Sequence, residues 1–295
     1  MEFIYDAFPS NEDNTVAWVM KRSNIENIEC RYVKRSPTQD YSIAYISSQT
    51  GCNQACRMCH LTQLGHNTTT NVTPEHLKLQ LKIILDHMAS IGDLSKYVYV
   101  NFMARGEPLL AEPLYCSGVM QEMITLARGY GRYVRFNIST IMPNSFNLSL
   151  VDAFYDVRPV FYYSMYSVDT QFRRKWLPRA MPVDRALMML KDWQEQTMMI
   201  IKIHHAYIAG ENDSDEQVNM MIDALLDAEI RHDVNIVRYN PADNQSYIES
   251  ERIEDIAALW STRVPDSIVQ IKPRVGFDVK ASCGMFFDNA GIAVA

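Results

Sequence analysis

The chain has 295 residues, 47% of them hydrophobic, which is enough to fill the core of one α/β barrel or of two ordinary domains. Its formal net charge of −7 excludes a protein that coats nucleic acid through a global positive field, although local basic patches remain compatible with it. The first residues lack a basic stretch followed by an apolar one, and no later run approaches the roughly eighteen apolar residues of a membrane span, so we expect a cytoplasmic protein without a membrane partner.

Short apolar, β-branched or aromatic runs alternate with amphipathic stretches along most of the chain. Residues 1–40 are predicted to form a short N-terminal extension, a β-hairpin, and residues 41–295 the main domain with a C-terminal segment that carries Cys283. Strands are predicted at residues 42–48, 97–103, 133–139, 160–166, 200–207, 234–239 and 268–272. Helices are predicted at residues 73–89, 118–127, 183–194, 214–228 and 253–262. This alternation predicts a parallel sheet with crossover helices, and it leaves open whether the sheet closes.

Three of the six cysteines lie close together in the loop after the strand predicted at residues 42–48. Cys52, Cys56 and Cys59 have the spacing C-x3-C-x2-C, which lets a short turn aim three thiols at one point, as an iron–sulfur cluster requires. Three ligands leave one iron of a four-iron cluster open. That iron can chelate the amino and carboxylate groups of S-adenosylmethionine (SAM), and an electron passed through it can cleave the sulfonium to a 5′-deoxyadenosyl radical. The spacing therefore predicts a 4Fe–4S cluster and SAM as cofactors.

Zinc is the competing metal for the three thiols. Structural zinc sites need four closed ligands, usually supplied as two separated pairs, and here His60 or His66 would have to provide the fourth. A chance crowding of structural cysteines is the remaining alternative.

Seven sequence blocks, in the same order, resemble the radical SAM superfamily and within it the RlmN/Cfr-like RNA adenosine methyltransferases. The blocks are ISSQTGCNQACRMCHLTQLGHN, NFMARGEPLL, IST, FYYSMYSVDTQFRRKWLPR, IAGENDSDE, VRYNPADNQSY and GFDVKASCGMF. The resemblance covers the chain from about Ser42 to Phe286. It implies an α/β fold, a partial (βα)6 radical SAM barrel behind the N-terminal extension.

The resemblance also implies a SAM site at the ends of the strands. Glu107 would accept a hydrogen bond from the SAM ammonium group, a role that suits a carboxylate. The other residues implied at this site are Gly106, Pro108, Ser139, Ser164 and Asn240. Taken singly, each of these is also an ordinary turn or cap residue.

Cys283 resembles the methyl carrier of the family. In that chemistry a first SAM methylates the cysteine, the radical from a second SAM abstracts a hydrogen from the new methyl group, and the methylene radical adds to C2 or C8 of adenine. Without this role, Cys283 would be a small buried apolar residue.

The chain departs from the family pattern in several places. Tyr45 stands where the family has a second cysteine that deprotonates the adduct and resolves it through a disulfide with the carrier. A phenol can take up a proton but cannot form that disulfide, so either another thiol replaces it, with Cys30 the nearer candidate and Cys116 the remoter, or the reaction differs. Tyr166 replaces a usual histidine, Met58 stands at an often aromatic position, and the N-terminal part is too short for the accessory RNA-binding domain.

Three functions are compatible with these features. The first is an RlmN/Cfr-type methyltransferase that modifies an adenine-type base in RNA through Cys283, with basic groups around Arg173 and Arg132 as phosphate contacts and flavodoxin or ferredoxin as reductant; these groups are otherwise solvated faces. The alternative is a radical SAM enzyme that abstracts hydrogen directly from a small molecule, nucleotide or protein, without a methylated cysteine. The third is a non-catalytic protein that keeps the SAM pocket or the cluster as a binding or sensing element.

Overall fold

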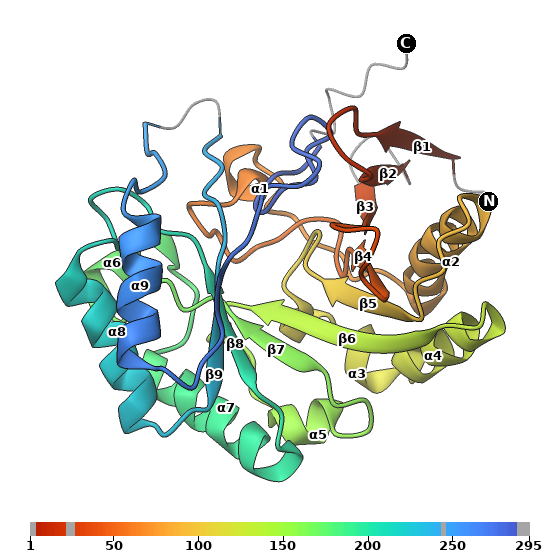
Figure 1. Ribbon diagram of the computed structural model, residues 1–295. Coiled ribbons are helices and arrows are strands. Elements are labelled where there is room, and N and C mark those ends of the chain that lie inside the picture. The colour runs from red at the N-terminus through yellow and green to blue at the C-terminus, as the bar shows by residue number, and fades with distance from the viewer. Residues whose placement is uncertain (1–3, 22–26, 243–245, 288–295) are drawn as a thin grey trace.

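The computed structural model describes residues 4–21, 27–242 and 246–287. Ten strands form one curved sheet with helices along its outer face (Figure 1). The strands are β1 (Ile4–Pro9), β2 (Val16–Lys21), β3 (Asn27–Val33), β4 (Tyr41–Ile46), β5 (Tyr97–Phe102), β6 (Tyr133–Thr140), β7 (Val160–Tyr163), β8 (Ile201–His205), β9 (His232–Ile236) and β10 (Val269–Ile271). The helices are α1 (His60–Gln63), α2 (Pro74–Ser90), the 3-10 turn η1 (Pro108–Leu110), α3 (Pro113–Cys116), α4 (Val119–Gly129), α5 (Leu150–Phe154), α6 (Thr170–Trp176), α7 (Val183–Thr197), α8 (Asp215–Asp227) and α9 (Ile253–Arg263).

The sheet is a partial barrel of the predicted α/β type. Strands β4 to β10 pair in parallel in chain order, with at least one helix in each connection. Within the described ranges β10 pairs with β9 and β1 with β2, and no ladder joins β10 to β1. The barrel is therefore open on one side.

All seven predicted strands and all five predicted helices are present, with small differences at their ends. Strand β7 ends at Tyr163 instead of residue 166, because the chain turns there and Tyr166 has a left-handed φ of +59°. The short helices α1, α3, α5 and α6 were not predicted. Their four to seven residues are too few for a helical hydrophobic pattern to emerge.

The N-terminal extension holds a third strand in addition to the expected hairpin. Strands β1, β2 and β3 pair antiparallel, and β3 also pairs antiparallel with β4. Every residue of β3 is buried, as expected for a strand that lies between two others. The extension therefore continues the barrel sheet, and the division at residue 40 stays a prediction.

The two faces of the sheet differ in polarity. The outer face packs against the helices through large apolar side chains such as Phe161, Trp193 and Trp260, which are fully buried. The inner face carries polar side chains that include Asn101 and Asn137, which hydrogen-bond to each other at 2.7 Å. Among the residues that the structure describes, no helix is long and apolar enough to cross a membrane.

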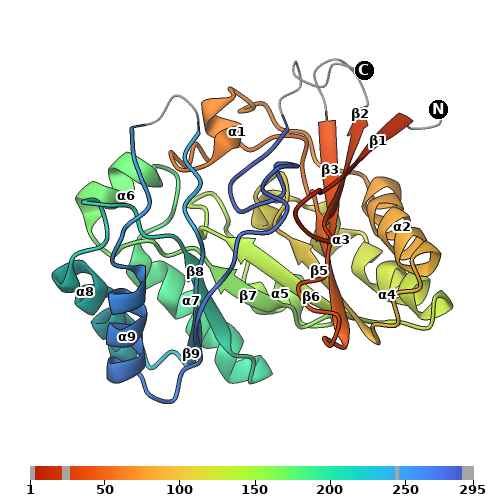
Figure 2. The ribbon, with the colours of Figure 1, turned by 45° about the horizontal axis from the view of Figure 1, so that its top comes forward.

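The segment after β10, residues 272–287, crosses the open side of the barrel and reaches the N-terminal extension (Figure 2). Asp278 accepts hydrogen bonds from Ser10 Oγ at 2.7 Å and from the Asn11 amide at 2.8 Å. The Gly276 amide donates to Asp13 at 2.8 Å. The extension thus anchors the C-terminal segment over the hollow of the sheet.

Candidate active site

The loop between β4 and α1 brings the three clustered cysteines to one cavity. Cys52, Cys56 and Cys59 line this cavity together. The Cys52 amide donates to the His66 carbonyl at 3.0 Å, and the Cys59 amide donates to the Cys56 carbonyl at 3.1 Å. Gly51 is required at the start of the loop, since a Cβ there would lie 2.3 Å from the Thr68 carbonyl oxygen. The tight backbone therefore brings the three thiols to one cavity, and their binding of a cluster stays a prediction.

The electrostatics of the thiols fit a cluster site. Burial raises the pKa of Cys52, Cys56 and Cys59, and the neighbouring thiols raise that of Cys52 and of Cys56 further. Desolvated thiols of this kind remain neutral unless a positive centre stabilises their thiolates. Iron bound here would supply such a centre, because metal coordination deprotonates a thiol outright.

The zinc alternative finds no support in the geometry. Within residues 4–21, 27–242 and 246–287, no three His, Cys, Asp or Glu side chains are placed to hold a single metal ion. The His60 ring instead contacts the Asn240 carbonyl oxygen at 3.0 Å. The three cysteines would instead hold a cluster with several irons, which does not require them to surround one ion.

Glu107 lies in the same cavity as the cysteines and is only 4% exposed. Its carboxylate oxygens accept hydrogen bonds from the amides of Leu109 and Ile141, both at 3.2 Å. In the described part of the chain neither oxygen forms an ion pair with Lys or Arg, and burial raises the pKa of Glu107 to about 7. A buried carboxylate of this kind is suited to an ammonium group supplied by a ligand.

Gly106 and Pro108 shape the turn that presents Glu107. Gly106 has a φ of +105°, and a Cβ at this position would lie 2.7 Å from Gln49 Cβ. Gln49 Oε1 accepts a hydrogen bond from the Glu107 amide at 3.0 Å, and Pro108 begins the turn η1. Only glycine fits this close approach of two backbone segments.

Ser139, at the end of β6, and Ser164, just after β7, line the cysteine cavity as well. Their hydroxyl oxygens are 3.5 Å apart. Both are partly exposed at the cavity wall, so their hydroxyls are available to a ligand. Their expected contact with SAM remains a prediction that this placement permits.

Cys283 belongs to the C-terminal segment and lines a neighbouring cavity that it shares with Cys56 and Cys59. Asn240 Nδ2 donates to the Cys283 carbonyl at 2.9 Å, and the His60 amide donates to the Gly284 carbonyl at 3.0 Å. Cys283 is exposed at the cavity wall, but the residues around it desolvate its thiol enough to raise the pKa to about 11. The fold therefore holds this cysteine beside two of the three that were predicted to bind the cluster.

Asn240 has a different set of partners from those expected of a SAM ligand. Besides the Cys283 carbonyl, its side-chain oxygen accepts a hydrogen bond from Arg274 Nε at 2.8 Å. It lines the cavity around Cys283 rather than the one that contains Glu107. Direct contact of Asn240 with SAM stays a prediction, whereas the structure shows its hydrogen bond to the Cys283 carbonyl.

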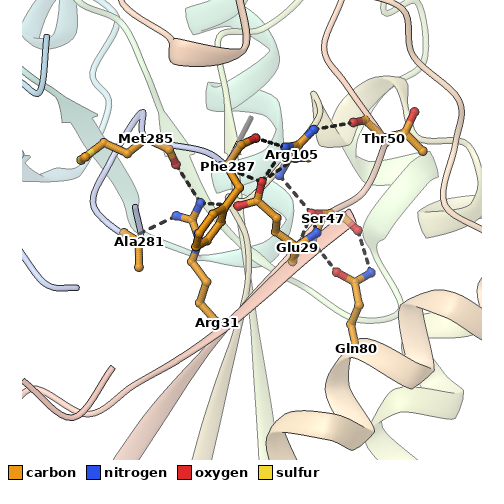
Figure 3. Close-up of polar contacts among 9 residues, drawn as sticks. All are labelled: Glu29, Arg31, Ser47, Thr50, Gln80, Arg105, Ala281, Met285 and Phe287. Atoms are coloured by element: carbon orange, nitrogen blue, oxygen red, sulfur yellow. Dashed lines mark hydrogen bonds and ion pairs between the residues drawn. The ribbon is translucent and has the colours of Figure 1, made fainter. Parts of the chain in front are cut away.

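A buried ionic network, which the sequence did not reveal, fixes the C-terminal segment to the barrel (Figure 3). Glu29 is fully buried and accepts from Arg105 Nε at 2.7 Å, from an Arg31 guanidinium nitrogen at 3.0 Å and from the Phe287 amide at 3.1 Å. Arg31 also donates to the Met285 carbonyl at 2.7 Å. The one feature of the sequence that could have indicated this network is the pair Glu29 and Arg31, because opposite charges two residues apart share one face of a strand.

The same network reaches the cysteine loop. Arg105 precedes Gly106 and donates to the Thr50 carbonyl at 3.2 Å and to the Phe287 carbonyl. Ser47 Oγ accepts from the Glu29 amide at 3.0 Å. One set of charges therefore connects β3, the cysteine loop and the segment that carries Cys283.

Tyr45 lines a cavity inside the barrel that Cys283 also lines, and its hydroxyl accepts from Arg35 at 3.5 Å. Neither of the other candidate thiols lies there. Cys30 is fully buried in the core on the helix side, because it alternates with Arg31, the cross-strand neighbour of Tyr45. Cys116 is exposed at the end of α3, on the outside of the barrel. Replacement of the missing thiol by Cys30 or Cys116 is therefore wrong.

Two of the expected phosphate contacts are also wrong. Arg173 is only 7% exposed and donates to the carbonyls of Met165, Ser167 and Met181, so it braces the loop after β7. Arg132 precedes β6 and donates to backbone carbonyls at the end of the barrel opposite the cysteines. The exposed basic residues near the cysteine loop are instead Arg57, Arg174, Lys175 and Arg179.

Comparison with solved structures identifies the fold. A crystal structure of a radical SAM methyltransferase from Sphaerobacter thermophilus matches with a TM-score of 0.80 and 18% identity, over 96% of this chain and 80% of that one. The structure of anSMEcpe with bound AdoMet matches with a TM-score of 0.51 and 14% identity, over 76% of this chain and 61% of that one. The chain therefore has the fold of the radical SAM enzymes, a class that uses SAM and a 4Fe–4S cluster.

Comparison with curated sequences finds RNA methyltransferases among the similar proteins. The probable dual-specificity RNA methyltransferase RlmN of Flavobacterium psychrophilum is 24% identical over 251 residues, which cover 84% of this chain and 70% of the relative. The ribosomal RNA large subunit methyltransferase Cfr of Staphylococcus aureus is 22% identical over 290 residues, 92% of this chain and 75% of the relative. No protein-family profile matches the chain. The chain is thus similar in sequence to the RNA methyltransferases RlmN and Cfr over most of its length, and it shares the fold of a radical SAM methyltransferase.

Proposed function

We propose that this enzyme methylates an adenine-type base in RNA and that Cys283 carries the methyl group. The observation that carries the proposal is the position of Cys283, which lines one cavity with Cys56 and Cys59 and is held there by Asn240 and His60. The named activities of the relatives, RNA methyltransferases in both cases, support the substrate class. We further propose a cytoplasmic setting and a flavodoxin or ferredoxin as electron donor.

Each site residue has a role that its placement supports. Cys52, Cys56 and Cys59 would hold the cluster, and Glu107 would bind the ammonium group of SAM, with Gly106 and Pro108 shaping its turn. Ser139, Ser164 and Asn240 would contact the remainder of SAM. When bound, the cluster and SAM supply a methyl group and an organic radical at this place.

We propose that the Tyr45 hydroxyl relays the proton that leaves the modified base, accepting it while it releases its own proton to solvent. Its phenol lines the cavity that Cys283 lines, with Arg35 beside it. Tyr45 cannot break the thioether between Cys283 and the base. The radical adduct formed on addition to the base would first give up one electron, which the oxidised cluster would accept, and one proton. A thiolate from outside the chain would then attack the Cys283 sulfur and form a disulfide with it. The electron pair of the broken carbon–sulfur bond would take up a proton at the methylene carbon, which becomes the methyl group.

The RNA is proposed to lie across the rim formed by Arg57, Arg174, Lys175 and Arg179. The Arg57 guanidinium lies 5.4 Å from the centre of the Tyr247 ring, and the Lys175 ammonium lies 5.0 Å from it. Exposed cations interleaved with aromatic rings provide both phosphate contacts and stacking surfaces.

Mass spectrometry of the anaerobically reconstituted protein after incubation with SAM tests the role of Cys283. We expect a methyl group on Cys283 and on no other cysteine, and Cys116→Ser, on the outside of the barrel, should be methylated normally. If Cys283 stays unmodified while 5′-deoxyadenosine accumulates, the carrier role is refuted. Direct hydrogen abstraction, to which Tyr45 in place of the second cysteine already points, would then replace it.

A further inference from the structure

The interior of the barrel contains a second cavity, here called the lumen cavity, below the loop that carries Cys283. Cys283 and Asn240 line both the lumen cavity and the cavity that contains Cys56 and Cys59. The lumen cavity extends between the inner faces of β4 to β9 and the segment after β10. Its polar and aromatic lining includes Tyr41, Tyr45, Tyr99, Asn101, Tyr162 and Asn235.

The lumen cavity is strongly cationic although the whole chain is acidic. No Asp or Glu belongs to its described lining, whereas the chain as a whole has a net charge of −7. The cations of the lining are Arg31, Arg35, Arg238, Lys272 and Arg274. Such a concentration of one sign inside a low-dielectric wall focuses a positive potential.

Two of these cations have no acidic partner in the described residues. Arg31 pairs with Glu29, and Glu249 pairs with both Arg238 and Arg274. Arg35 has its side-chain contact with the Tyr45 hydroxyl, and Lys272 with the side chain of Gln270. Both unpaired cations face the lumen cavity.

The unpaired cations repel each other. Burial, followed by Arg35 and then Lys202, lowers the pKa of Lys272 to about 8, and Asp233 offsets this only in part. Lys202 itself pairs with Asp233. An anion between Arg35 and Lys272 would remove this repulsion and restore full protonation of the lysine.

Three buried nitrogen atoms of the lining also lack hydrogen-bond partners among the described residues. They are Arg31 Nε, Arg35 Nε and His204 Nδ1. Native proteins leave few buried polar atoms unsatisfied, and several in one cavity indicate that a ligand or solvent completes them. The Tyr162 ring lies 5.3 Å from the His204 ring, which places an aromatic surface next to these atoms.

We propose that the lumen cavity is an anion site in which Arg35 and Lys272 hold a phosphate group of the adenine nucleotide that is modified. This inference rests on the proposed function, because it takes the nucleotide to be the substrate of Cys283. Arginine and lysine are the usual phosphate ligands, the tyrosines offer stacking surfaces, and the asparagines match the donor and acceptor edge of adenine. The phosphate belongs either to a free nucleotide or to a nucleotide within RNA.

The test measures binding to the reconstituted holoprotein by equilibrium dialysis with three probes: inorganic phosphate, AMP and a short adenosine-containing RNA. Arg35→Gln and Lys272→Gln should each bind phosphate and AMP about tenfold more weakly, the loss expected for one charge-assisted hydrogen bond. Lys82→Gln, which removes one charge from the outer face of α2, should bind like the unmodified protein. Arg35→Lys keeps the charge and should retain most of the affinity, which separates loss of a ligand from misfolding.

The outcomes distinguish the sources of the phosphate and the two proposals. Weaker AMP binding by the variants with unchanged RNA binding supports a free nucleotide, and weaker RNA binding supports a nucleotide within RNA. Equal binding of all probes by the unmodified protein, Arg35→Gln and Lys272→Gln overturns the anion site. The methylation state of Cys283 is read in the same samples: an unmethylated Cys283 with intact phosphate binding contradicts the carrier role and leaves the anion site standing.

Discussion

Tyr45 is the residue at which the chemistry proposed for this chain departs from a two-cysteine mechanism. It faces the same cavity as Cys283, and the two remaining thiols outside the cluster loop are sealed in the core or lie on the outside of the barrel. In the proposed mechanism, a covalent bond between Cys283 and the base therefore has no internal thiol to break it. The proposed need for an external thiol follows from the presence of Tyr45 in place of a cysteine.

Tyr45→Cys should introduce internal release. In the unmodified protein we expect a covalent adduct between protein and RNA that accumulates without added thiol and disappears on addition of a small thiol. In Tyr45→Cys the adduct should be less abundant, and a disulfide between positions 45 and 283 should appear, because a thiolate at this position can attack the carrier sulfur. Denaturing electrophoresis and peptide mapping measure both, with Tyr45→Phe as the control that supplies no thiol. Equal adduct in Tyr45→Cys and Tyr45→Phe would contradict the role given to this position.

At the level of elements, a buried carboxylate joins the first strands of the barrel. Asp93 accepts hydrogen bonds from Lys34 at 2.8 Å, from Tyr32 at 2.9 Å and from Ser42 at 2.5 Å, and so ties β3 and β4 to the loop before β5. Burial raises the pKa of Asp93, but the hydrogen bonds from Lys34, Ser42 and Ser95 lower it more, and the net pKa lies well below its usual 3.8. A lowered carboxyl pKa contributes stability above the unfolded value, and this contribution is lost as the pH falls below it.

Asp93→Asn should therefore lower the free energy of unfolding by about 2 kcal/mol at pH 7. The difference in the free energy of unfolding between the two proteins should shrink as the pH falls from about 5 towards 2, because the Asp93 carboxylate becomes protonated in that range. Denaturant unfolding at a series of pH values measures it. Asp86→Asn, which removes an exposed partner of Lys82, should change the free energy by less than about 0.5 kcal/mol at every pH.

The C-terminal segment is held in place by charged side chains that belong to other parts of the chain. Glu29 and Arg105 are fully shielded from solvent and together bind the amide and the carbonyl of Phe287. Removal of Arg105 would leave the buried Glu29 with Arg31 as its remaining cation, and the loss of one partner from a buried ion pair costs about 3 to 5 kcal/mol. The position of Cys283 thus depends on β3 and on the residue before Gly106.

Arg105→Met should loosen the segment more than it unfolds the barrel. We expect faster proteolytic cleavage after residue 272, a large loss of Cys283 methylation, and a loss of about 3 kcal/mol in the free energy of unfolding. Arg263→Met, which breaks an exposed pair with Asp223, is the matched control. It should leave proteolytic cleavage and Cys283 methylation unchanged and alter the free energy of unfolding by less than about 0.5 kcal/mol. Unchanged cleavage and methylation in Arg105→Met would show that the network does not position Cys283.

At the level of the whole molecule, the positions of the charged residues matter more than the net charge. The net charge of −7 coexists with a basic rim next to the cysteine loop and with a cationic lumen cavity. At the other end of the barrel, Arg132 donates hydrogen bonds to backbone carbonyl oxygens. RNA binding should therefore depend on the rim and not on the basic residues at this other end of the barrel.

The double variant Arg174→Gln and Lys175→Gln should weaken RNA binding and reduce the slope of log affinity against log salt by about 1 to 2, since two phosphate contacts are lost. Arg132→Gln, at the opposite end of the strands, is expected to leave the slope unchanged. A salt titration of fluorescent RNA binding measures both. Equal slopes in all three proteins would remove the rim from the RNA site.

The sequence by itself determined the alternating strands and helices and the three clustered cysteines, because hydrophobic periodicity and ligand spacing are local properties. It also supplied Glu107 and Cys283 through their motifs, but not the relation between them. Only the tertiary structure placed Cys283 beside Cys56, removed Cys30 and Arg173 from the reactive surface, and gathered Arg35 and Lys272 around one cavity. Those outcomes depend on the curvature of the sheet and on contacts between residues some 250 positions apart, such as Arg31 with Met285, which no local pattern encodes.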